Sequence, residues 1–115
     1  MNSDDTERLR HMLAAICEPF AFAEGKVSGD LVRDRLLLLV LVKEIEIIGE
    51  APSKVSAEGR NAFPGIPWKE ITGMRNRLTH GYFDWDLEVI WSTLTNNMPV
   101  LKEEVERALA GSQAG

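Results

Sequence analysis

The sequence has little that would tie it to a disulfide, a metal or a membrane. Its one cysteine, Cys17, cannot form an internal disulfide and so indicates no oxidising compartment. One cysteine and two distant histidines are too few for a structural zinc site, which takes about four such ligands. No apolar run approaches the ~18 residues of a membrane span, and the amino-terminal residues are acidic, unlike a secretory signal. We therefore expect a cytoplasmic protein with no metal, no cofactor and no membrane segment.

Positive charge is also scarce, except in one place. The net charge of −5 argues against a broad surface for nucleic acid. Residues 68–82, however, hold Lys69, Arg75 and Arg77 against the single acid Glu70. A polyanion that binds this chain is therefore expected at a small, focused site in this segment.

No segment alternates between apolar and polar residues, so no strand is predicted, whereas apolar residues recur at helical spacing. We predict an all-α fold: a four- to five-helix bundle formed by a single domain, residues 1–110, with a flexible tail at 111–115. The expected helical segments are 3–24, 29–48, 55–58, 68–80 and 85–110. Their predicted boundaries are the caps Ser3, Ser28 and Asp84, a stop at Gly25, a bend or interruption at Gly49-Glu50-Ala51-Pro52, Pro67 in a first helical position and a kink or restart at Pro99.

One predicted helix is apolar on every face. Its residues 36–42 read Leu-Leu-Leu-Leu-Val-Leu-Val, too few to cross a bilayer and too apolar to lie against water on one side. Such a helix must be covered by protein all round. We expect a second copy of the chain on its outer side, and hence a homodimer. The alternative is a central helix wrapped by its own bundle.

The decapeptide 73–82 gathers two arginines, a histidine and the only tyrosine of the chain. On a helical wheel Arg75, Asn76 and His80 share a polar arc, and Tyr82 returns over Arg75. Arg75 and His80 are five residues apart, so they converge on one ligand only if the last turn unwinds or is a 3₁₀ turn.

This set of side chains suits attack at a phosphodiester of RNA. A histidine can transfer a proton near neutral pH, and a guanidinium can bind and stabilise a phosphate. RNA supplies its own nucleophile, the 2′-hydroxyl, so no metal is required. The alternative is structural: cations favour the negative end of a helix, and Tyr82 can simply pack.

Other candidate residues have two possible roles each. Glu50 could point towards the decapeptide or be structural. Asp84, Asp86 and Glu88 could bind a metal, but helix capping explains them better. The three tryptophans at 68, 85 and 91 could stack on bases, although their helical positions favour the core.

The pattern Arg75-Asn76-x-x-x-His80-x-Tyr82 resembles the Arg-x4–6-His motif of HEPN domains, and most closely that of HepT-type toxins. Further similar segments are Asp34-Arg35-Leu36, Glu46-Ile47-Ile48-Gly49-Glu50-Ala51, Ile66-Pro67-Trp68, Gly73-Met74-Arg75-Asn76, His80-Gly81-Tyr82-Phe83 and Asp86-Leu87. Pro52 departs from the family, in which this helix generally continues, and it leaves the course of residues 50–60 open.

The resemblance implies a HEPN-type helical bundle that dimerises through the bundle and acts as a metal-independent endoribonuclease toxin. Arg75 and His80 would be the catalytic pair at the dimer interface, with Asn76 as an auxiliary residue. Tyr82 would be the residue to which an MntA-like nucleotidyltransferase antitoxin attaches AMP. The substrate would be RNA, with tRNA one candidate, and the product would carry a 2′,3′-cyclic phosphate. Two other readings stay open: a non-catalytic binding module that pairs with a nucleotidyltransferase, and a purely structural helical dimer.

Overall fold

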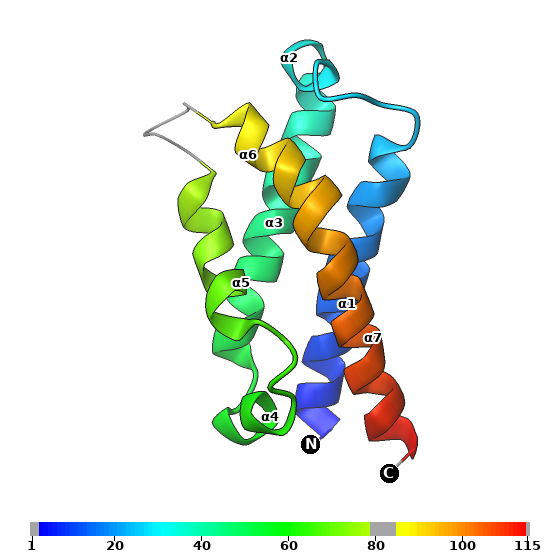
Figure 1. Ribbon diagram of the computed structural model, residues 1–115, viewed down its shortest axis with the longest axis vertical. Helices are drawn as coiled ribbons and strands as arrows, with labels where there is room; N and C mark the ends of the chain where they lie inside the picture. Colours follow the sequence, from blue (N-terminus) through cyan, green and yellow to red (C-terminus); the bar gives the residue numbers. More distant parts are fainter. Residues whose placement is uncertain (1–2, 79–84, 115) are drawn as a thin grey trace.

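A computed structural model of the chain describes residues 3–78 and 85–114 (Figure 1). The described elements are α1 (Ser3–Ala23), α2 (Asp30–Arg33), α3 (Arg35–Lys54), α4 (Ala57–Ala62), α5 (Trp68–Met74), the 3₁₀ turn η1 (Arg75–Arg77), α6 (Leu87–Ser92), the π-helical turn η2 (Thr93–Asn97) and α7 (Met98–Ala114). These elements are all helical, so the all-α prediction is confirmed. No helix within the described ranges has both the length and the apolar character needed to cross a bilayer.

The helices form an elongated bundle of 46 × 29 × 19 Å. α1, α3 and α7 run along its long axis, and α5 packs against α3 on the side away from α1 (Figure 1). α6, η2 and α7 follow one another without a break and act as a single column. α4 closes one end of the bundle, where both termini lie, and α2 lies at the opposite end (Figure 1). This arrangement agrees with the predicted four- to five-helix bundle.

The core is aliphatic and joins all the long helices. Its fully buried large side chains are Leu9, Met12, Ile16, Leu31, Leu41, Ile45, Ile48, Ile71, Leu78, Ile90, Met98 and Leu101. All three tryptophans are partly buried and pack against this core, as predicted, although Trp85 precedes α6 and is not helical. Ile71 and Met74 of α5 are buried in this core, so α5 is held in place against α3.

The predicted helix 29–48 is in fact two helices separated by Asp34. Asp34 is extended (φ −108°, ψ 91°), and its carboxylate accepts a hydrogen bond from the Leu37 amide at 3.0 Å, which makes it the N-cap of α3. The prediction of Ser28 as a cap is wrong, because the N-cap of α2 is Gly29, which has no side chain to bond to the first turn. An aspartate at the start of a long apolar run is itself a strong capping signal.

Of the predicted bend or interruption at Gly49-Glu50-Ala51-Pro52, the interruption is wrong, because α3 continues through Pro52 to Lys54. Proline removes one backbone donor and crowds the preceding turn, which costs most in the middle of a helix. Here α3 ends two residues later, and Arg60 Nη1 donates to the Pro52 and Val55 carbonyls at 2.7 Å each. The next helix is α4, capped by Ser56, in place of the expected 55–58.

The later boundaries differ in detail. Pro67 is the residue before α5, one position earlier than predicted, and α5 gives way to the 3₁₀ turn at Arg75. The fourth helix begins at Leu87 with Asp86 as its cap, and Asp84 lies outside the described residues. Pro99 falls in the first turn of α7, directly after the π turn, where a missing amide is tolerated. α7 includes residues 111–114, which the sequence analysis had assigned to the tail, whereas Gly25 (φ 75°) follows the end of α1 as predicted.

Within residues 3–78 and 85–114, no helix of the bundle covers the outer face of α3. Leu36 is 68% exposed, Leu39 40% and Ile47 38%, whereas Leu37, Leu41 and Ile45 on the inner face are buried. The alternative of a central helix wrapped on all sides by its own chain is therefore wrong. We call Leu36, Leu39 and Ile47 the α3 stripe.

Candidate active site

Arg75 and Asn76 both lie in the 3₁₀ turn η1, and both are exposed. A 3₁₀ turn at this point is the distortion that the spacing of Arg75 and His80 requires, although the sequence placed it nearer the end of the helix. His80 and Tyr82, the other two predicted site residues, lie outside the described residues.

Arg75 extends from η1 across to α3. Its Nη1 donates to Glu50 Oε1 at 3.1 Å, and both side chains are about half exposed, at 48% and 50%. An exposed pair of this kind contributes only about 0–1 kcal/mol to stability. The pair therefore fixes the direction of the guanidinium more than it holds the fold together, and it gives Glu50 the orientation towards Arg75 that the sequence left open.

Gly49 lets Arg75 lie this close to α3. A Cβ added at Gly49 would lie 3.4 Å from the Cβ, Cγ and Cδ atoms of Arg75, at the short limit of ordinary van der Waals contact. The aliphatic stem of the arginine thus lies directly on the backbone of α3, and its charged end reaches the next residue, Glu50. Two consecutive residues of α3 position one side chain.

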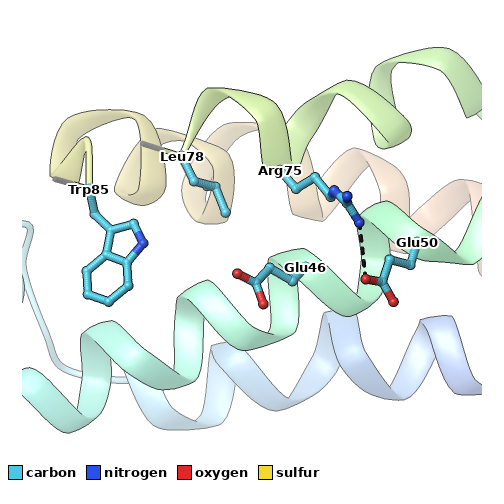
Figure 2. A pocket seen from close by; sticks show the side chains of 5 residues that line it. All are labelled: Glu46, Glu50, Arg75, Leu78 and Trp85. Carbon is cyan, nitrogen blue, oxygen red and sulfur yellow. Dashed lines mark hydrogen bonds and ion pairs between the residues drawn. The ribbon is translucent and has the colours of Figure 1, made fainter. Parts of the chain in front are cut away.

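The Arg75 side chain lines a pocket of about 340 Å³ (Figure 2). Its lining residues are Glu46, Glu50, Arg75, Leu78 and Trp85. Leu78 is buried and forms an apolar floor, and the Trp85 ring points into the pocket from the segment before α6 (Figure 2). The pocket can therefore offer one cation, two carboxylates and an aromatic surface to a ligand.

The two sides of this pocket are held together by a backbone contact. The Asp86 amide donates to the Leu78 carbonyl at 2.6 Å, so the end of η1 and the start of α6 are adjacent. The Asp86 carboxylate then accepts from the Val89 amide at 3.1 Å and begins α6. Asp86 is therefore a capping residue, which accounts for one member of the acidic group that could have been read as a metal site.

Sequence reasoning missed Glu46 and Gly49 as parts of the site, and it weighed Trp85 only as one of three tryptophans that could stack on bases. Glu46 and Glu50 are four residues apart and so share one helix face, which was a usable signal. The contact of Gly49 with Arg75 spans 26 residues of sequence and depends on how α3 and α5 pack, which spacing within one helix does not reveal.

Comparison with known proteins identifies the family. The profile of the HepT-like ribonucleases matches residues 7–108. A protein of Caldanaerobacter subterraneus subsp. tengcongensis, provisionally named RNase TTE0752, is 36% identical over 104 residues, covering 87% of this chain and 93% of the relative. A protein of Methanocaldococcus jannaschii, provisionally named RNase MJ1380, is 35% identical over 98 residues, covering 85% and 90%.

A third relative, from Thermococcus cleftensis, is named "Probable ribonuclease HepT" and is 35% identical over 78 residues, covering 68% of this chain and 71% of the relative. No solved structure matches significantly. The profile match, these relatives and the HEPN-type helical bundle agree, and the chain belongs to the HepT-like ribonuclease family.

Proposed function

We propose that the chain is the toxin of a toxin–antitoxin pair and a metal-independent endoribonuclease. Arg75 and His80 are the catalytic residues, and Asn76 is an auxiliary polar residue of the same motif. The observation that carries this proposal is the position of Arg75, whose guanidinium is exposed at the mouth of a pocket and oriented by α3. His80 follows Leu78, which lines that pocket, by two residues in the sequence.

The proposed reaction is an internal transesterification of RNA. The 2′-hydroxyl oxygen attacks the neighbouring phosphorus and loses its proton to a histidine, while the bond from phosphorus to the 5′-oxygen breaks. The leaving 5′-oxygen takes a proton, and the products carry a 2′,3′-cyclic phosphate and a 5′-hydroxyl. Arg75 binds the phosphoryl oxygens and stabilises the extra negative charge of the transition state. RNA, with tRNA one candidate, is the substrate.

Phosphate must compete with Glu50 for Arg75. A guanidinium has five donors, so it can retain one bond to Glu50 while it offers a pair of N–H groups to phosphate. Glu46 and Glu50 also place negative charge beside the site. This negative charge weakens any general attraction of the site for the RNA backbone. We therefore expect Arg75 to bind one phosphate through directed hydrogen bonds.

The active form in this proposal is a homodimer. On a wheel of α3, Ile47 lies about 20° and Glu50 about 40° from Leu36, so the α3 stripe borders the pocket. A second copy that covers the stripe buries its apolar side chains and brings a second Arg75 and His80 towards the first pair. Two histidines then serve the two proton transfers, one as base and one as acid.

The antitoxin in this proposal is an MntA-like nucleotidyltransferase that attaches AMP to Tyr82. The added phosphate places negative charge and bulk close to Arg75 and excludes the RNA phosphate. The intact mass of the chain after coexpression with such a partner tests this step. We expect a gain of whole AMP units that Tyr82→Phe abolishes; the same gain in Tyr82→Phe would contradict the assignment.

The central experiment is cleavage of RNA by the purified chain in EDTA. We expect cleavage that leaves 2′,3′-cyclic phosphate ends, detected by resistance of the ends to phosphatase until acid opens the ring. His80→Ala should lose the activity. Cleavage by His80→Ala at the wild-type rate would contradict the mechanism.

A second function has one observation in its favour, since Glu50 already occupies part of the Arg75 guanidinium. In that alternative the chain is a non-catalytic HEPN module that binds a nucleotidyltransferase and carries nucleotide on Tyr82. Expression without a partner separates the two. The wild-type chain inhibits growth if it is a ribonuclease toxin and is harmless if it is a binding module.

A further inference from the structure

The groove between α3 and α5 contains a second pocket, one helical turn from the Arg75 site. It has a volume of about 240 Å³, and its lining residues are Pro52, Ser53, Arg60, Trp68, Lys69 and Thr72. Ser53 follows Glu50 by three residues on α3, and Thr72 precedes Arg75 by three on the antiparallel α5. The two pockets therefore lie one after the other along the same groove, about 4.5 Å apart along the helix axes.

The two pockets differ in charge. Carboxylates from Glu46 and Glu50 line the first, whereas none of the described residues that line the second is acidic. Lys69 is exposed and has no ion-pair partner within residues 3–78 and 85–114. Arg60 is partly occupied, because it donates to two backbone carbonyls and its charge helps to lower the pKa of Asp5. Lys69 is the cation that the second pocket offers to a ligand.

The two hydroxyl groups of this pocket already donate their protons. Ser53 Oγ donates to the Glu50 carbonyl at 2.7 Å, and Thr72 Oγ1 donates to the Trp68 carbonyl at 3.1 Å. Their oxygens remain free to accept a hydrogen bond. A ribose 2′-hydroxyl can donate such a bond, and it is the group that separates RNA from DNA.

Trp68 adds a fixed aromatic surface. Its Nε1 donates to the Arg60 carbonyl at 3.0 Å and to the Phe63 carbonyl at 3.1 Å, and the side chain is only partly buried. The ring is thus held in place while part of it faces the pocket. Base stacking on such rings is common in proteins that bind single-stranded RNA.

We propose that this second pocket binds a ribonucleotide of the substrate next to the phosphate that is cleaved at Arg75. Lys69 contacts its phosphate, Thr72 Oγ1 accepts from its 2′-hydroxyl, and its base packs on Trp68. The volume is too small for a typical small-molecule ligand and suits one unit of a longer chain. This inference rests on the proposed ribonuclease function and adds a binding subsite to it.

The test is binding of a labelled single-stranded RNA by the full chain carrying His80→Ala, which the proposed mechanism makes inactive. In this background Lys69→Gln should weaken binding about fivefold at 0.1 M salt and reduce the slope of log Kd against log salt by about 0.7, as expected for one lost phosphate contact. The matched control is Lys26→Gln, an exposed lysine in the segment between α1 and α2. It should leave both quantities unchanged.

Thr72→Val tests the ribose contact, because it keeps the size of the side chain and removes the acceptor. It should weaken binding of RNA and leave binding of the DNA of the same sequence unchanged. Equal effects of Lys69→Gln and Lys26→Gln on RNA binding would overturn the subsite. A second contradicting result would be that millimolar AMP displaces the RNA and that this displacement requires Lys69, because the ligand of the pocket would then be a free nucleotide.

Failure of the subsite is distinguishable from failure of the proposed function. If the wild-type chain cleaves RNA in EDTA and Lys69→Gln binds and cleaves like wild type, only the subsite is wrong. If no variant binds RNA and the wild-type chain does not cleave it, the proposed function and the subsite both fail.

Discussion

Two regions of this bundle contrast in how they use polar side chains. At the α4 end, Asp5 is only 2% exposed and its carboxylate accepts from both the backbone amide and the hydroxyl of Ser56. Arg60 and Trp68 in the same region bond to backbone carbonyls. At the Arg75 site the arginine side chain is 48% exposed, and among the described residues its guanidinium bonds only to Glu50.

The two ends of α5 therefore have different roles: polar groups at one end stabilise the fold, and polar groups at the other end are available to a ligand. α5 begins in the bonded α4 region, at Trp68, and ends at the open site, at Arg75. Saturated, buried polar groups stabilise a fold, while exposed groups with spare donors are available to a ligand. The contrast predicts that changes to the buried Asp5–Ser56 pair lower stability with little effect on the activity of each folded molecule, and that changes at the Arg75 site do the reverse.

The largest expected effect outside the catalytic residues comes from the α3 stripe. Leu36→Glu with Ile47→Glu places two charges on the proposed dimer surface, where both residues are exposed in the single chain. We expect a folded monomer by sedimentation and loss of RNA cleavage. Val100→Glu is the matched control, since Val100 is 58% exposed but lies on α7. A double variant that stays dimeric, or a monomer that cleaves normally, would contradict the proposed assembly.

Gly49→Ala tests whether activity and stability separate at the site. The new methyl group lies 3.4 Å from the Arg75 stem, at the short limit of ordinary van der Waals contact, so the stem shifts by a few tenths of an ångström at most and we expect cleavage to fall about threefold. Alanine favours a helix over glycine by up to about 1 kcal/mol, so the melting temperature should hold or rise.

The control for this change is Gly73→Ala, whose added methyl group meets nothing within 4 Å. It should gain the same helix propensity and leave cleavage unchanged. Equal activity of Gly49→Ala and Gly73→Ala would show that the close approach of Arg75 to α3 has no functional role.

Asp5→Ala tests the α4 end. It leaves the Ser56 amide without its partner, and we expect a loss of about 2 kcal/mol, or a fall of about 10 °C in the melting temperature. The cleavage rate per folded molecule should stay within about twofold. The hydrogen bonds from the Ser56 hydroxyl and amide hold the pKa of Asp5 below its usual value, so this contribution is present above about pH 4 and is lost as the pH falls through the lowered pKa. A large loss of activity at full folding would break the contrast.

The smallest predicted effect concerns Glu44 on α3. Its partial burial, and then its hydrogen bond with Glu18 of α1, raise the pKa of Glu44 to about 7. The folded chain therefore holds a proton that the unfolded chain releases near pH 4.5, and stability should decline as the pH rises from about 4.5 to 7. Because the group is largely solvated, we expect about 1 kcal/mol or less. Glu44→Gln should flatten this part of the pH profile in urea unfolding; an unchanged profile would contradict the assignment.

The sequence predicted the helical class and the apolar outer face of α3, because each depends on neighbours within one helix. It predicted a distorted turn near Gly81, outside the described residues, whereas the 3₁₀ turn of the structure begins at Arg75. Local patterns were ambiguous at Asp34 and Pro52, where capping and a nearby helix end decided the outcome. The contacts that organise the two regions could not be predicted. Asp5 and Ser56 are 51 residues apart, and Glu50 and Arg75 are 25 apart, so both pairs depend on the packing of separate helices.

The most direct test of the account compares two arginines of the same 3₁₀ turn. Arg75 reaches the pocket beside α3, while Arg77 lines a different pocket, against α6 and η2. The measurement is the rate at which Arg75→Ala and Arg77→Ala cleave one labelled RNA in EDTA, at equal folded fraction. The account predicts a loss of about a hundredfold or more for Arg75→Ala and a change within a few-fold for Arg77→Ala. Equal rates for the two variants would contradict it.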